Sequence, residues 1–87
     1  MWIMSQDKET LVNSDTVTGI VLEDIQKQNG QTKIWELNHV NILACSAYRG
    51  GAFELGRYKT VDRAKKELSV LCDSLTNDTV FYSMPED

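Results

Sequence analysis

The chain has 87 residues, of which 41% are hydrophobic and 25% are charged, and its net charge is −4. These proportions are ordinary for a small globular protein, so they exclude wholesale disorder and give no indication of a membrane partner. We therefore expect a single small domain spanning residues 1–87.

The first half of the chain predicts short strands separated by polar turns. The N-terminus is apolar for only four residues and has no basic leader, which favours a first strand at residues 2–5 over a signal peptide. Residues 16–23 are rich in β-branched side chains and predict a strand, with Gly19 as a candidate bulge position. The Asn-Gly pair at 29–30 predicts a turn, and residues 33–37 predict the next strand.

The segment from residue 42 to residue 58 predicts a β-hairpin. A three-residue loop of Arg49, Gly50 and Gly51, with a glycine in the left-handed position, separates the side chains into two faces. The face expected in the core holds Leu43, Cys45, Ala47, Phe53 and Leu55. The face expected to be open holds Ile42, Ser46, Tyr48, Glu54 and Tyr58. A two-residue loop would instead bury Glu54 among apolar neighbours, so the three-residue loop is preferred.

The hairpin leads directly into a predicted amphipathic helix. Thr60 is the expected N-cap, Asp62 lies in the first turn near the positive end of the helix dipole, and Asn77 is the expected stop. At about 100° per residue, one stripe is predicted to face the core. It consists of Val61, Ala64, Leu68, Leu71, Cys72 and Leu75. Glu67 is expected on the opposite, solvated side.

The end of the chain predicts a last strand at residues 79–83. Residues 84–87 are expected to be a flexible tail, because Pro85 cannot donate to a strand ladder and the final charges favour water. Consecutive strands joined by short turns pair antiparallel, and one helix covers only one face of a sheet. The predicted fold class is α+β: an antiparallel meander sheet of about five strands, one helix packed on one face, and a final short strand beside an earlier one.

Few groups in the sequence carry catalytic or metal-binding chemistry. His39 is the only histidine, and no spacing places it beside a nucleophile. Two cysteines and one histidine without a CxxC or HxxxH spacing do not assemble a metal site. The sequence therefore predicts no enzyme, no cofactor and no metal site.

The two cysteines bear on the cellular compartment. Cys45 lies in a predicted strand and Cys72 on the inner face of the predicted helix, which fits two buried thiols. Reduced thiols favour a cytoplasmic location, and a disulfide between them is the less favoured alternative.

Several segments resemble a group of short uncharacterised proteins of Gram-positive bacteria and their phages. These segments are residues 1–7, residues 11–13, the LGRYKT unit at 55–60 with Arg63 and Ala64 in the following helix, and the YSMP unit at 82–85. The resemblance covers both ends of the chain and the hairpin–helix unit, whereas residues 13–47 contribute little. It implies a bacterial or phage protein, no particular activity and no catalytic residue.

A basic segment contrasts with the acidic remainder of the chain. Residues 48–66 contain six basic and two acidic side chains, although the whole chain is negative. Phosphates attract such clusters, and an aromatic ring on an open sheet face can stack on a base. The candidate binding residues are Tyr48, Arg49, Arg57, Tyr58, Lys65 and Lys66. Nucleic-acid binding is nevertheless the alternative hypothesis, because helical ion pairs compensate part of this charge and the acidic remainder repels a polyanion.

A protein-interaction module is the preferred hypothesis. A sheet with one helix leaves its second face or an edge strand partly uncovered. On the predicted open face, Ile42, Tyr48 and Tyr58 would supply the apolar and aromatic anchors that interfaces use. The partner is either a second copy of the chain or an unknown protein, and the resemblance favours a host or phage protein.

Overall fold

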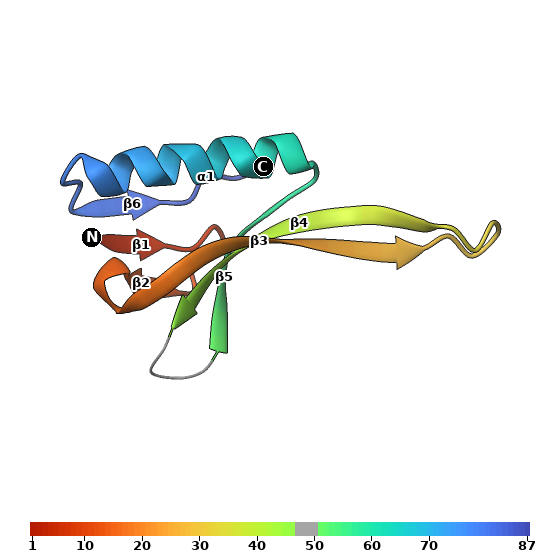
Figure 1. The fold of residues 1–87 in the computed structure, drawn as a ribbon, viewed down its shortest axis with the longest axis horizontal. Coiled ribbons are helices and arrows are strands. Elements are labelled where there is room, and N and C mark those ends of the chain that lie inside the picture. The colour runs from red at the N-terminus through yellow and green to blue at the C-terminus, as the bar shows by residue number, and fades with distance from the viewer. Residues whose placement is uncertain (47–50) are drawn as a thin grey trace.

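The computed structural model describes residues 1–46 and 51–87, which form two small sheets and one α-helix (Figure 1). The first sheet has the strand order β2-β1-β6. In it, β1 (Trp2–Met4) is antiparallel to β2 (Leu11–Asn13) and parallel to β6 (Phe81–Ser83). The final strand therefore returns beside an earlier one, as predicted.

The second sheet is an antiparallel meander with the order β3-β4-β5. Its strands are β3 (Val17–Gln28), β4 (Trp35–Ser46) and β5 (Gly51–Tyr58). The helix α1 (Val61–Thr76) follows β5 and packs against this sheet. β3 and β4 are the longest strands, and Figure 1 shows them extending well beyond the helix.

The α+β class is confirmed, but the prediction of one five-stranded meander is wrong. A short 3-10 helix, η1 (Ser14–Thr16), separates β2 from β3. Asn13 caps it, because the Asn13 side-chain oxygen accepts a hydrogen bond from the Asp15 amide at 3.0 Å. The chain turns there, so β2 pairs with β1 and the strands divide between two sheets.

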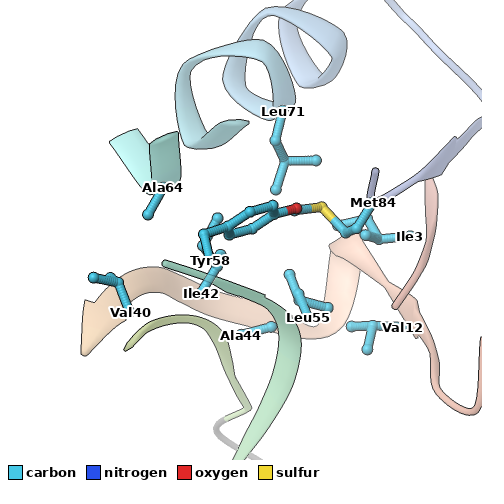
Figure 2. Close-up of a cluster of buried hydrophobic side chains, with 10 residues drawn as sticks. All are labelled: Ile3, Val12, Val40, Ile42, Ala44, Leu55, Tyr58, Ala64, Leu71 and Met84. Carbon is cyan, nitrogen blue, oxygen red and sulfur yellow. The ribbon is translucent and has the colours of Figure 1, made fainter. Parts of the chain in front are cut away.

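One hydrophobic core joins both sheets and the helix (Figure 2). Its buried side chains are Ile3, Val12, Val40, Ile42, Ala44, Leu55, Tyr58, Ala64, Leu71 and Met84. In Figure 2 the Tyr58 ring lies between the helix side chain Leu71 and the sheet side chains Ile42 and Leu55. The helix-covered side of the second sheet is therefore its core face.

The predicted register of the β4–β5 hairpin is wrong. Val40 pairs with Tyr58, and Ser46 pairs with Gly51, so Gly51 belongs to β5 and not to a three-residue loop. The other two predicted loop residues, Arg49 and Gly50, lie outside the described residues.

A β-bulge explains why the predicted faces are exchanged. Ile42 lies opposite Gly56 and Leu43 opposite Glu54, which leaves Leu55 as an extra residue in β5. With this bulge, residues 53, 55 and 58 all contribute to the core, although strict alternation would place Tyr58 on the opposite face from the other two. Ile42 and Tyr58, predicted to be open, are consequently fully buried.

The residues predicted for the core side of the hairpin are displaced by the same change. Leu43 and Cys45 lie half-buried on the face away from the helix, and Ala47 is outside the described residues. The cysteines are free, with Cys45 half-buried and Cys72 exposed, so the expectation of two buried thiols is wrong for Cys72.

The predicted ends of the helix are confirmed. The Thr60 hydroxyl oxygen accepts a hydrogen bond from the Arg63 amide at 3.1 Å, and Asn77 is the C-cap residue. The predicted buried stripe is only partly correct. Ala64 and Leu71 are buried, whereas Cys72 and Leu75 are exposed.

The burial of Glu67 shows that the buried side of the helix is rotated relative to the stripe predicted from the sequence. Its carboxylate was expected to face water, yet Glu67 is only 6% exposed. Arg63 compensates the buried charge, because its Nε lies 3.0 Å from Glu67 Oε1. The helix therefore turns its Ala64–Glu67–Leu71 side toward the sheet and leaves Leu68 half-buried.

Replacing the helix N-cap tests this local structure. Thr60→Ala should lower the free energy of unfolding by about 1 kcal/mol, because the Arg63 amide loses its acceptor. Chemical denaturation followed by circular dichroism measures the change. Ser69→Ala, at an exposed position inside the helix, should leave the midpoint nearly unchanged. Equal midpoints for wild type and Thr60→Ala would contradict the capping role.

The last four residues, which the sequence predicts to be a flexible tail, begin at the core and end in water, with Glu86 and Asp87 exposed. Met84 is buried, and its amide donates a hydrogen bond to the Met4 carbonyl at 2.9 Å. The Tyr58 hydroxyl donates to the Pro85 carbonyl at 2.8 Å, and the Lys59 amide donates to Asp87 Oδ2 at 2.8 Å. These bonds join the C-terminal segment to β1 and to the end of β5.

Candidate interaction site

The structure separates the predicted binding residues that it describes. Arg57 points away from the helix-covered face, and its Nη2 lies 3.2 Å from Glu54 Oε1. Lys65 and Lys66 are exposed on α1, on the other side of the second sheet. Tyr48 and Arg49 lie outside the described residues. Arg57 and the two lysines thus do not form one basic surface.

Tyr58, the fourth described member of that set, is a core residue. Its hydroxyl donates a hydrogen bond to the Pro85 carbonyl, and the Arg63 guanidinium carbon lies 5.6 Å from the centre of its ring. Burial, followed by the nearby Glu67 carboxylate, raises the pKa of Tyr58 to about 12. The ring therefore stays neutral and inaccessible, and it can neither stack on a base nor anchor a partner.

Part of the basic segment is also engaged within the chain. Arg63 contacts Glu67, and its Nη2 donates a hydrogen bond to the Glu86 carbonyl at 3.0 Å. The nucleic-acid hypothesis stays a prediction. Among the described residues, however, Tyr58 is buried, and both Arg57 and Arg63 are paired with glutamates.

A different surface is conspicuous, namely the outer half of the β3–β4 hairpin, residues 23–38, called the arm below. No residue of the arm is buried. The molecule measures 48 × 26 × 20 Å, and Figure 1 shows the arm projecting along the longest dimension beyond the end of α1. The arm thus lies outside the hydrophobic core.

The turn of the arm is held by its own hydrogen bonds. The Asn29 amide donates to the Ile34 carbonyl at 2.9 Å, and the Lys33 amide donates to the Asn29 carbonyl at 2.8 Å. The Asn29 side-chain oxygen also accepts a hydrogen bond from the Gln31 amide at 2.9 Å. Lys33 adopts a left-handed conformation with φ 58°. These contacts fix the position of the side chains that follow.

The arm carries large apolar side chains in water. Ile34 and Trp35 are each 62% exposed, and Leu37 is 40% exposed. Trp35 pairs with Gln28 and Leu37 with Gln26, which places both on the side of the sheet that also carries Val40. The apolar stripe of β4 therefore continues past the part that the helix covers.

A second uncovered apolar surface lies at the other end of β3. The start of β3 and one side of α1 enclose a groove lined by Val17, Ile20, Leu68, Cys72 and Leu75, together with Ser14, Thr18 and Gly19. Three of these side chains belong to the helix stripe that the sequence predicts to be buried. Among the described residues, Leu68 packs partly against the core, whereas Cys72 and Leu75 of that stripe are left exposed.

β3 itself is an edge strand. Within residues 1–46 and 51–87 it pairs only with β4, which leaves the outward N–H and C=O groups of β3 open. The edge lies between the arm and the groove, so all three features belong to one surface. Sequence reasoning missed this surface, although a tryptophan next to an Asn-Gly turn was visible.

Two other features concern possible ligands. Among the described residues, no group of three or more histidine, cysteine or acidic side chains could hold a metal ion. The amide Nδ2 of Asn38 lies 3.0 Å from Nδ1 of His39, the half-buried histidine of β4.

In the part of the chain that the structure describes, no helix is both long enough and apolar enough to cross a membrane.

Comparisons with known proteins provide no family assignment. No protein-family model matches the chain, and neither a curated protein nor a solved structure matches it significantly. Its function must therefore be argued from the surface described above.

Proposed function

We propose that this chain is a non-catalytic protein-interaction module and that the arm is the element that contacts the partner. The exposed Trp35 carries this proposal, because tryptophan is among the side chains most enriched at the centres of interfaces. A two-stranded hairpin beyond its core is also marginal in water by itself, so a partner would stabilise it.

The cellular setting belongs to the same proposal. Two free cysteines fit a reducing cytoplasm, and the resemblance to short proteins of Gram-positive bacteria and their phages points to a host or phage protein as partner. Neither point depends on the other.

A paired substitution tests the role of the arm. Trp35→Ser with Leu37→Ser should leave the denaturation midpoint nearly unchanged, because both side chains are exposed. The same variant should lose association, measured by sedimentation velocity and by quantitative affinity capture from a Gram-positive lysate. Val70→Ser with Val80→Ser, which removes two exposed apolar side chains outside the arm, is the matched control. Equal association of both variants and wild type would contradict the proposed function.

A further inference from the structure

We propose that two copies of this chain associate through the outer edges of their β3 strands, so that their second sheets join into one continuous sheet. The inference rests on the proposed function and names the partner as a second copy. The pairing of β3 with β4 is irregular near Ile25, but the extra residue is Asn38 of β4. Between Gly19 and Gln28 the outer edge of β3 is therefore regular and able to accept another strand.

The charges of β3 favour one antiparallel register. If a two-fold axis passes through Ile25, Glu23 of each copy lies opposite Lys27 of the other, with the two Ile25 side chains between these pairs. An axis at Asp24 would place two aspartates opposite each other. An axis at Gln26 would place Lys27 opposite Ile25 and Asp24 opposite Gln28, so neither charge would face an opposite one.

Glu23 and Lys27 are available for these contacts. The ion pairs among the described residues are Arg57 with Glu54 and Arg63 with Glu67. None of these involves the edge of β3. The charges at residues 23 and 27 therefore form no ion pair within the described part of one chain, although Glu36 lies across β4 from Lys27.

The same axis brings the two uncovered apolar surfaces together. Gln28, the cross-strand partner of Trp35, would lie opposite Leu22 of the second copy. Trp35 of one copy would then lie about 10 Å, two strand spacings, from Leu22 of the other and on the side covered by its helix. The tip of each arm would run along residues 17–20 of the other copy, where the groove opens.

This arrangement is closed and reciprocal. Each arm covers the entrance to the groove of the other copy: residues 30–33 of its tip lie along Val17 and Ile20, and Trp35 is the nearest apolar side chain that it brings. A two-fold axis uses the same surface on both copies, and the assembly stops at two chains. The groove and the arm are thus two halves of one interface.

Sedimentation equilibrium of the purified full chain tests the association. The expected result is a dimer of twice the chain mass at tens of micromolar protein. A wild-type chain that stays monomeric up to about 100 micromolar would overturn the proposal.

Charge reversal tests the register. Glu23→Lys alone and Lys27→Glu alone should each weaken self-association about tenfold or more, because like charges then face each other twice. An equimolar mixture of the two variants should dimerise again. At positions 23 and 27, the Glu23→Lys variant has two cations and the Lys27→Glu variant has two anions, so opposite charges face each other in the mixed dimer. The chain carrying both substitutions should dimerise like wild type. Dimerisation unaffected by the single substitutions, or not recovered in the mixture, would overturn the register.

Cross-linking gives a second readout that does not depend on charge. With Cys45→Ala and Cys72→Ala as background, Ile25→Cys should form an intermolecular disulfide on mild oxidation, because the two positions meet at the axis. Val21→Cys lies on the same face but away from the axis, so it should remain unlinked. Equal cross-linking of both variants would overturn the proposed axis.

The outcomes separate this inference from the proposed function. A monomeric wild type whose capture of another protein still requires Trp35 would overturn the dimer and leave the interaction module in place. If the variant with Trp35→Ser and Leu37→Ser kept both self-association and capture, the proposed function itself would be overturned.

Discussion

Tyr58→Ser should lower the free energy of unfolding by about 3–5 kcal/mol, because it leaves a cavity where a fully buried ring lies. The ring lies between the helix and the second sheet (Figure 2). Its hydroxyl donates a hydrogen bond to the Pro85 carbonyl. A domain of 87 residues is expected to have about 4–13 kcal/mol in total, so this loss brings it close to unfolding. Urea denaturation followed by circular dichroism measures the effect.

Tyr58→Phe is the matched control for that substitution. It keeps the ring and removes only the hydrogen bond to Pro85, so the loss should be about 1 kcal/mol. If Tyr58→Ser instead left the denaturation midpoint unchanged, the ring would lie on an open face and the structure of β5 described above would be wrong.

Leu71→Ala should have the second largest effect, a loss of about 2–5 kcal/mol in unfolding free energy. Leu71 is fully buried on the sheet-facing side of α1, and its truncation leaves a cavity beside Tyr58. Guanidinium denaturation of the purified variant gives the value. The size of the loss reports how completely the surrounding side chains close the cavity.

Two neighbouring positions are controls for the orientation of the helix. Val70→Ala lies on the outer side of α1 and should change stability by no more than about 0.5 kcal/mol. Leu75→Ala should lose less than about 1 kcal/mol within one chain, because Leu75 is exposed in the groove. A loss at Leu75 equal to that at Leu71 would support the stripe predicted from the sequence and contradict the observed rotation.

The bulge at Leu55 accounts for the most consequential error of the sequence analysis. Side-chain alternation in an unbroken strand puts Phe53 and Leu55 on one face and Tyr58 on the other. One extra residue brings all three to the core, and no local property of the sequence specifies it. Tyr58 is therefore a core residue and not part of an open face, and the candidate interaction site lies on the arm instead.

The spacing of Gly56 and Tyr58 is visible in the sequence, but the sequence alone does not show that the tyrosine ring packs on the glycine. A Cβ atom at Gly56 would lie only 2.9 Å from Cε2 of the Tyr58 ring, so the ring packs directly over the glycine backbone. The Gly-x-Tyr spacing is visible in the sequence, but its meaning depends on the direction in which Tyr58 points. The bulge and the core decide that direction.

Sequence patterns predict the features that depend on neighbouring residues. These are the α+β class, the helix with its Thr60 and Asn77 caps, the turn at residues 29–30 and the existence of a last strand. Their hydrogen bonds and steric preferences act within a few residues, so local patterns predict them. The division into two sheets, the burial of Tyr58 and Glu67, and the projection of the arm depend instead on tertiary contacts. Strand pairing and burial join residues that are distant in the chain, and a shift of one residue in pairing exchanges the faces.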